Sequence, residues 1–152
     1  MTIYFHSPRE VPYGCFSNFS PHGFHLDGKW WPTGEHYYQA QKFVGTPYAE
    51  RIRAARSPQE AADLGQSRAV PLRLDWDSAR VAVMRRLLTA KFSTHAQLRE
   101  ILLATGDEPI VEDSPSDYYW GCGKHGTGKN VLGRLLVEVR DTLRSCQAQA
   151  TV

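Results

Sequence analysis

The sequence predicts a mainly α fold of the α+β class, in one domain with a small β element near its N-terminus. The chain has 152 residues, an ordinary size for one domain. Its composition, 41% hydrophobic and 22% charged, is that of a globular protein. Helix-start signals and apolar residues at a 3.6-residue period recur from position 33 onward, whereas the preceding segment is rich in Gly, Pro, Ser and aromatic residues.

The β element is expected from short alternating segments. Strands are predicted at 2–6 and 24–26, and the tight-turn pair Asp27-Gly28 folds the second of these back on residues 29–31. Neighbouring side chains of a strand point to opposite faces, so Trp30 and Trp31 cannot both point inward. Another short strand is expected at 109–112.

Helices are expected wherever a capping residue precedes an apolar period. Thr33, Ser57 and Thr94 are the predicted N-caps of three of them. The predicted helices cover 34–44, 47–55, 58–65, a longer segment from 77, 95–106, and 131 to about 145. The predicted domain spans 1–146, and a frayed tail is expected at 147–152.

Composition excludes several classes of protein. The net charge of +2 argues against binding to nucleic acid or a membrane by bulk charge alone. A basic strip of Arg80, Arg85, Arg86 and Lys91 is possible on one helix, although a solvated face is the simpler interpretation. Three cysteines form no complete disulfide framework and lack metal-ligand spacing. No segment has the length and apolarity of a signal peptide or a membrane span, so a cytoplasmic protein is expected.

The first helix carries an unusual polar face. Helical spacing places Glu35, Tyr38, Gln39 and Lys42 together, so a carboxylate, an amide and an amine are in line to act on one substrate. The alternative is an ordinary solvated face. The aromatic neighbours of this face weigh against that alternative.

The second unusual segment, 117–130, is rich in glycine and leads into the last helix. Loop N–H groups together with a helix N-terminus form a natural phosphate site, to which Lys124 and Lys129 add charge. A structural glycine turn without ligand is the alternative. Residues 123–129 fit a P-loop pattern, but Asn130 replaces the hydroxyl residue and no βαβ order surrounds it, so a P-loop NTPase is not expected. Aromatic residues beside a phosphate site favour a nucleotide or nucleoside ligand.

Several long motifs resemble the YbiA-like family, also called NADAR, in the right order over nearly the whole chain. They are Phe16-Ser17-Asn18-Phe19-Ser20, residues 31–43, 68–76, 117–121 and 126–133. Gly34 departs from the family, which often has Ser there. The resemblance implies a helical YbiA-like fold and N-glycosidase chemistry without a metal or other cofactor. The implied partner is a phosphorylated ribosyl-base small molecule of the riboflavin pathway, a ribosylaminopyrimidine phosphate, or ADP-ribosylated guanine in nucleic acid. A non-catalytic module that binds ADP-ribose or a nucleotide is the alternative.

Cleavage of an N-glycoside builds positive charge on the anomeric carbon and electron density on the departing base. Glu35 is the expected catalytic group on the sugar side, and Asp117 is the second carboxylate. Lys42, if neutral, can attack the anomeric carbon and pass through a Schiff base. In the competing role, a charged Lys42 only holds phosphate or pairs with a carboxylate.

Binding roles follow from the same resemblance. Asn18 and Gln39 are expected to orient ribose hydroxyls, aromatic side chains to stack on the base, and loop glycines to cradle phosphate. The expected substrate-binding residues are Asn18, Phe19, Trp31, Tyr38, Gln39, Trp76, Trp120, Gly121, Gly123, Gly126, Gly128, Lys129 and Asn130.

Overall fold

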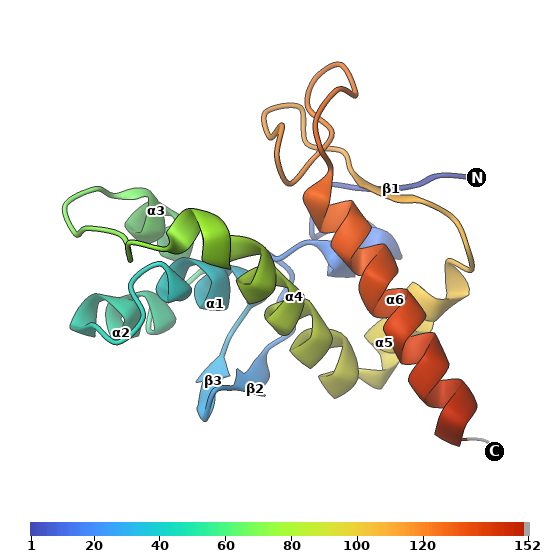
Figure 1. Ribbon diagram of the computed structural model, residues 1–152, viewed down its shortest axis with the longest axis horizontal. Coiled ribbons are helices and arrows are strands. Elements are labelled where there is room, and N and C mark those ends of the chain that lie inside the picture. The colour runs from blue at the N-terminus through green and yellow to red at the C-terminus, as the bar shows by residue number, and fades with distance from the viewer. Residues whose placement is uncertain (151–152) are drawn as a thin grey trace. The chain divides into compact units, whose positions relative to one another are not determined.

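A computed structural model describes residues 1–150 of the chain and shows a mainly helical α+β protein, as predicted (Figure 1). The helices are α1 (Gly34–Gln41), α2 (Pro47–Arg53), α3 (Pro58–Gln66), α4 (Trp76–Thr94), α5 (Ala96–Ala104) and α6 (Val131–Ala150), with a 3-10 turn at Tyr13–Phe16. The strands are β1 (Ile3–Phe5), β2 (Phe24–Leu26), β3 (Lys29–Trp31) and β4 (Ile110–Glu112). No described helix combines the length and the apolarity that crossing a membrane requires.

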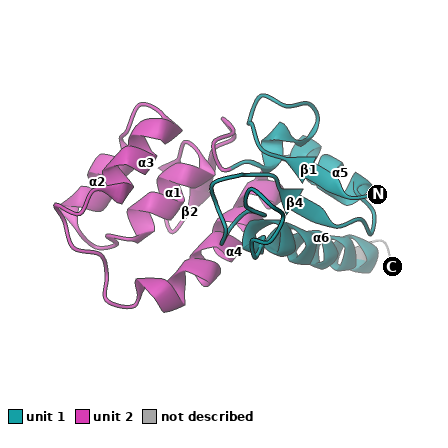
Figure 2. Cartoon of the chain, turned by 90° about the horizontal axis from the view of Figure 1, so that it is seen from above, with its two compact units in different colours: residues 1–17, 95–152 teal, residues 18–94 magenta. Residues whose placement is uncertain are grey.

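The chain forms two compact units, which Figure 2 shows in different colours. Unit 1 comprises residues 1–17 and 95–152, and unit 2 comprises residues 18–94. Each unit is described by itself below.

Unit 2 begins with the predicted hairpin. Strands β2 and β3 are antiparallel, with Phe24 opposite Trp31 and His25 opposite Trp30. Asp27 and Gly28 both have positive φ, 54° and 76°, which is the backbone of a tight hairpin turn. The predicted alternation is confirmed, because Trp31 is 3% exposed and Trp30 is 46% exposed.

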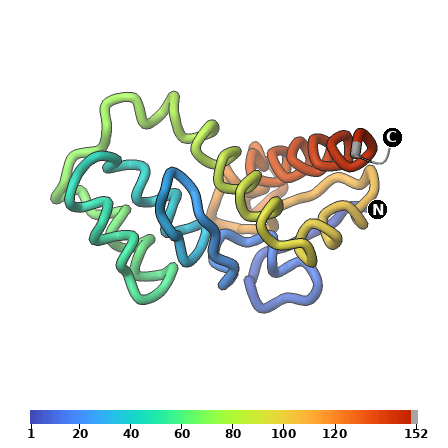
Figure 3. The backbone as a smooth tube through the Cα atoms, turned by 90° about the horizontal axis from the view of Figure 1, so that it is seen from below, coloured from blue at the N-terminus to red at the C-terminus, as the bar shows by residue number. Residues whose placement is uncertain are grey.

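Helices α1, α2 and α3 follow one another and pack together, and their path can be traced in Figure 3. Each begins at a hydroxyl that accepts a hydrogen bond from a first-turn N–H, namely Thr33, Thr46 and Ser57. Helix α1 ends at Gln41, before the predicted end, and the chain turns through Gly45, whose φ is 82°. Gly65 does not end α3, because it lies inside that helix.

A buried histidine fixes the position of α1. His36 is 1% exposed, and its two ring nitrogens lie 2.7 Å from Thr33 Oγ1 and 3.0 Å from Ala55 O. Burial lowers the pKa of His36, so the ring is neutral, donates to the Ala55 carbonyl and accepts from the Thr33 hydroxyl. This side chain therefore connects the start of α1 to the segment after α2.

Unit 1 contains a two-stranded parallel sheet, in which Ile3 lies opposite Ile110. Helix α6 packs against β4 and α5. The buried apolar side chains of this unit include Phe5, Phe16, Leu102, Ile110, Leu132, Leu136 and Val139. The core of this unit therefore comes from both ends of the chain.

Two predicted boundaries in this part of the chain are wrong. Thr94 does not cap α5, because its hydroxyl donates to Ala90 O in α4, and α5 starts after His95 without a side-chain cap. Helix α6 continues to Ala150, past the predicted end near 145, so the segment 147–150 is helical. Residues 151 and 152, the rest of the predicted tail, lie outside the described residues.

Candidate active site

The polar face of α1 is buried, so the alternative of an ordinary solvated face is wrong. Tyr38, Gln39 and Lys42 are only 8%, 4% and 7% exposed, and Glu35 is half-buried. These four side chains come from positions one helical turn apart. A carboxylate, an amide and an amine are therefore held together in a largely dry environment within unit 2.

The Lys42 amine lies against two aromatic rings. Its Nζ is 5.6 Å from the centre of the Tyr38 ring and 5.9 Å from that of Trp76, and the two rings meet edge to face at 5.2 Å. Burial and, to a smaller extent, the nearby Arg68 charge lower the pKa of Lys42 to about 8, while the Glu35 charge acts in the opposite direction. Trp76 therefore lies against the Lys42 amine, and its predicted role in substrate binding stays a prediction.

Two arginines in the segment after α3 make hydrogen bonds around the Lys42 group. Arg68 donates through Nη1 to the carbonyls of Gly65, Gln66 and Ser67, at 3.1–3.3 Å. The Arg73 N–H donates to Lys42 O at 2.9 Å, and the Arg73 guanidinium pairs with Asp75 immediately before Trp76. No residue pattern pointed to Arg68 or Arg73 as site residues, apart from their place in the family-like segment 68–76.

Asn18 lies beside the start of α1, and its role in orienting ribose hydroxyls stays a prediction. The Glu35 N–H donates to Asn18 O at 3.0 Å, and Asn18 Nδ2 lies 3.2 Å from Met84 Sδ. The buried Oδ1 of Asn18 makes no hydrogen bond with any described residue. A Cβ built on Gly34 would lie 2.9 Å from this oxygen. A serine at position 34, as the family often has, would therefore place its hydroxyl beside Asn18 Oδ1, and Gly34 supplies none.

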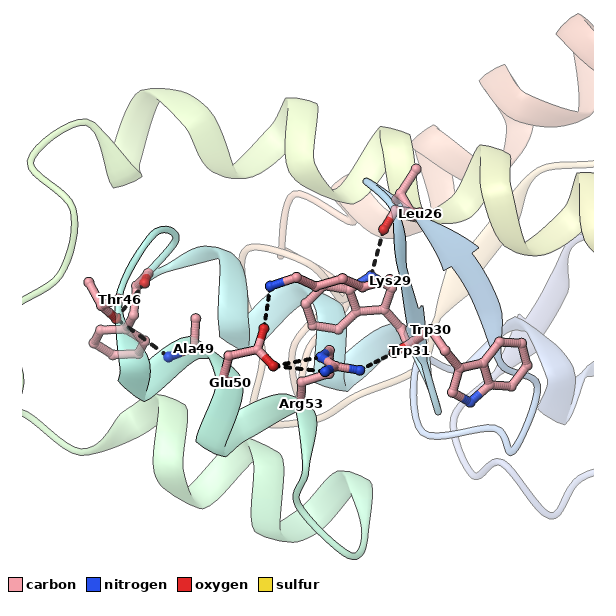
Figure 4. A network of polar contacts seen from close by, with 9 residues as sticks. Leu26, Lys29, Trp30, Trp31, Thr46, Ala49, Glu50 and Arg53 are labelled. Atoms are coloured by element: carbon pink, nitrogen blue, oxygen red, sulfur yellow. Dashed lines mark hydrogen bonds and ion pairs between the residues drawn. The ribbon is translucent and has the colours of Figure 1, made fainter.

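Trp31 is not part of this group. Its Nε1 donates to Leu26 O at 2.9 Å, its ring meets Tyr37 edge to face, and Arg53 covers it at 5.9 Å (Figure 4). It lines a separate cavity of about 580 Å³, together with Gln41 and residues 44–47. Gln41 and Lys42 are consecutive in the chain and point about 100° apart. The base-stacking role predicted for Trp31 stays a prediction, and it would place the base at this separate cavity.

Lys29 and Glu50, which line that cavity, form an ion-pair network with Arg53 (Figure 4). Lys29 and Arg53 both donate to the Glu50 carboxylate, and Arg53 Nη1 also donates to Trp30 O at 3.3 Å. These hydrogen bonds lower the pKa of Glu50 to about 2. The network ties the hairpin to α2.

In unit 1, Asp117 stabilises a turn. Its Oδ1 accepts hydrogen bonds from the N–H groups of Tyr119 and Trp120, at 3.0 and 2.7 Å. Trp120 is half-buried and meets Tyr119 edge to face at 4.9 Å. The catalytic role of Asp117, the stacking role of Trp120 and the substrate-binding role of Phe19 stay predictions.

The N-terminus of α6 donates its first N–H groups to the chain itself. Val131 and Leu132 donate to the carbonyls of Tyr119 and Trp120, at 3.0 and 3.1 Å. Gly128 and Lys129 donate to Cys122 O and Tyr118 O. These protons are engaged, so the phosphate site expected at the helix N-terminus lacks four of the donors on which it depended.

The glycines and Asn130 also have packing roles, which favours the structural turn over the phosphate cradle. A Cβ would lie 3.0 Å from Glu112 O at Gly121, 2.5 Å from Gly121 O at Gly128, and 2.3 Å from the Tyr118 ring at Gly123. The Asn130 side chain accepts from Glu112 N–H and donates to Ile110 O, so its amide binds β4. Gly126 has a positive φ of 73°, and Lys129 Nζ lies 5.8 Å from the Tyr119 ring.

Two further expectations concern charge and metal ligands. The possible basic strip does not include Lys91, which is completely buried, and Arg86 pairs with Asp27. Within residues 1–150, no three His, Cys, Asp or Glu side chains lie close enough together to hold a metal ion.

The chain is similar to several known proteins over most of its length. A protein named N-glycosidase Npun_R5314 from Nostoc punctiforme is 53% identical over 148 residues, which cover 95% of this chain and 94% of that one. N-glycosidase YbiA from Escherichia coli is 53% identical over 131 residues, 86% of this chain and 82% of that protein. A Zea mays protein named Riboflavin biosynthesis protein PYRR, chloroplastic is 45% identical over 146 residues, 86% of this chain but 23% of that protein.

A solved structure agrees with these sequence similarities. The NMR structure of the E. coli protein YbiA has a TM-score of 0.90 and 49% identity, and the similarity covers 97% of this chain and 88% of that one. The predicted fold and enzyme class, an N-glycosyl hydrolase, are confirmed by these relatives. The NADAR domain matches residues 4–144. The chain therefore belongs to the NADAR domain family.

Proposed function

We propose that this enzyme hydrolyses the N-glycosidic bond between a base and a phosphorylated ribose, and that its substrate is a ribosylaminopyrimidine phosphate of the riboflavin pathway. The names of the relatives support the bond type and the pathway. The observation that carries the mechanism is Lys42, a buried amine with a pKa near 8 on the same helix face as the Glu35 carboxylate.

The lowered pKa makes Lys42 a nucleophile at neutral pH. At pH 7, a pKa of about 8 leaves roughly one amine in ten unprotonated, about 300 times the fraction at the ordinary value of 10.5. The Nζ lone pair attacks the anomeric carbon, and the bonding electron pair of the N-glycosidic bond leaves with the base, which takes up a proton. The ribose then opens to a protonated Schiff base on Lys42.

Water completes the reaction. It adds to the Schiff-base carbon, the C–N bond to Lys42 breaks, and ribose phosphate leaves with the free amine restored. Glu35 is placed to stabilise positive charge on the anomeric carbon and to take a proton from the attacking water. Tyr38 and Trp76 keep bulk water from the amine and offer aromatic surface to the base.

A trapping experiment tests this proposal. The protein is incubated with a ribosylaminopyrimidine phosphate and sodium borohydride, and the adduct is located by peptide mass spectrometry. We expect a reduced ribose phosphate adduct on Lys42, and loss of turnover in Lys42→Ala and Glu35→Gln. Full turnover by Lys42→Ala would rule out the covalent step and leave Lys42 the role of holding phosphate.

The same assay separates the competing functions. ADP-ribosylated guanine in an oligonucleotide is the parallel substrate, and release of base and sugar is followed by mass spectrometry. We expect faster turnover of the small molecule, because Lys91 does not contribute to an exposed basic strip and the net charge is only +2. Binding of both compounds without turnover of either would instead identify a non-catalytic module.

We place the proposed hydrolysis in the cytoplasm.

A further inference from the structure

We propose that Gln39 is a positioning residue for Glu35, seated by the glycine at position 65, and that it does not bind the ribose. The inference rests on the proposed function, since it assigns Glu35 to the reaction. It replaces the role in orienting ribose hydroxyls that the sequence indicated for Gln39.

The donor end of the Gln39 amide is directed at Glu35. The two residues are one helical turn apart in α1, and Gln39 Nε2 donates to Glu35 Oε1 at 2.7 Å. The reverse orientation of the amide would set its carbonyl oxygen against the carboxylate, with two acceptors facing each other. The carboxylate therefore fixes the direction of the amide, and the amide in turn fixes the rotamer of the carboxylate.

The acceptor end of the same amide is closed off. Gln39 is 4% exposed, and its buried Oε1 makes no hydrogen bond with any described residue. It lies against Gly65 in α3, where a Cβ would be 2.0 Å from Oε1 and 2.7 Å from Cδ of Gln39. A ribose hydroxyl has no access to this oxygen, and only glycine at position 65 leaves room for the amide.

The hydrogen bond has a consequence for the amine. The groups that act on Lys42 are Glu35 on α1, Arg68 after α3, and the rings of Tyr38 and Trp76. Of these, the Glu35 charge favours protonated Lys42 and opposes burial and Arg68. A carboxylate released from Gln39 turns away toward water, so that Lys42 loses this attraction.

Two variants remove the contact by different routes. Gln39→Leu replaces the amide by an apolar side chain of similar size. Gly65→Ala changes none of the functional groups of the site, but its added methyl group pushes the Gln39 amide out of position. Gln66→Ala, at the exposed neighbouring position of α3, is the control. Thermal melts check folding, and the double variant Gln39→Ala/Gly65→Ala removes the clash, so it recovers stability without recovering turnover.

The kinetic measurement uses a ribosylaminopyrimidine phosphate. We expect kcat to fall about 10-fold or more in both single variants, with KM within about twofold of wild type. An increase in KM at unchanged kcat would show that Gln39 binds the ribose and would overturn the proposal.

The second measurement needs no turnover. NMR titration of the Lys42 Cε and Nζ signals, assigned with Lys42→Arg, is expected to give a lower pKa in Gln39→Leu than in wild type. A pKa that does not fall would overturn the inference even in an active enzyme. Failure of the proposed function is recognised separately, because the wild type itself would then turn over neither substrate, whereas failure of this inference leaves wild-type turnover intact.

Discussion

The Nζ atom of Lys42 lies 5.9 Å from the centre of the Trp76 ring, so one side of this amine faces an indole and not water. Replacement of Trp76 by Leu opens this side to solvent, which removes part of the desolvation that lowers the Lys42 pKa to about 8. We expect the alkaline rise of kcat to move up by at least about one pH unit, with about 10-fold lower activity at pH 7.5 and recovery above pH 9. A pH–rate profile is the measurement, and Trp30→Leu, at the exposed tryptophan of the hairpin, is the control. An unshifted profile would show that Trp76 does not keep the amine dry.

The buried Lys42 amine is also expected to lower the free energy of unfolding. Its pKa is lower in the folded chain than the ordinary 10.5, so the unfolded chain binds more protons between pH 8 and 10.5. The penalty is fully present below pH 8, and the stability of the wild type rises as the pH increases through that interval. Lys42→Met should therefore be more stable at pH 7 by about 1–3 kcal/mol and lack the rise. Urea denaturation at pH 7 and pH 10 measures both effects, and a variant less stable than wild type at pH 7 would contradict the argument.

Glu50 should make the fold sensitive to acid. The Arg53 and Lys29 hydrogen bonds lower its pKa to about 2, so its contribution is present above the ordinary value of 4.5 and is lost as the pH falls from there toward 2. The carboxylate is 44% exposed, and screening by solvent limits the effect of Glu50→Gln at pH 7 to less than about 1 kcal/mol. We expect the variant to lose less stability than wild type between pH 5 and pH 3 in chemical denaturation. Asp63→Asn, at an exposed carboxylate of α3, should retain the acid sensitivity of the wild type.

Substitutions of Gly34 test whether Asn18 Oδ1, which has no hydrogen-bond partner among the described residues, can accept a hydrogen bond from residue 34. A Cβ at this position crowds Asn18 Oδ1 and Leu87 Cδ1, at 2.9 and 3.1 Å, so Gly34→Ala should destabilise the protein. Gly34→Ser suffers the same crowding but supplies a hydroxyl to the unpartnered oxygen. We expect the serine variant to be more stable than the alanine variant by about 1 kcal/mol in denaturant titrations. Equal stabilities would indicate that Asn18 Oδ1 does not accept from residue 34.

The local elements were predictable because their signals are local. Asp27-Gly28 determines the hairpin turn, and the hydroxyls of Thr33 and Ser57 start α1 and α3. Helical spacing also predicted that Glu35, Gln39 and Lys42 share a face. Periodicity could not show whether that face is wet or dry, since this depends on α3 and α4 packing around it.

The remaining differences between expectation and structure depend on tertiary packing, which no local sequence pattern encodes. Trp31 lies beside α1 in sequence, but the hairpin packs so that Trp31 lines a cavity without Lys42. The glycines of 121–128 suggested free N–H groups, whereas the loop folds back so that its carbonyls accept from the first turn of α6. Gly65 resembled a helix stop because a close approach by a side chain from another helix leaves no mark in the sequence.

Helix α1 has eight residues, of which six are buried; it carries the candidate catalytic Glu35, and Lys42 follows directly at its C-cap. Tolerance to mutation along this helix is therefore expected to be low at almost every position, whether a side chain serves the fold or the reaction. Variation among homologues would record the same low tolerance, so an invariant position in α1 does not by itself identify a residue that takes part in chemistry. Only measurements that separate the amount of folded protein from its turnover distinguish Tyr37, which supports the hairpin, from its neighbour Tyr38, which encloses the amine.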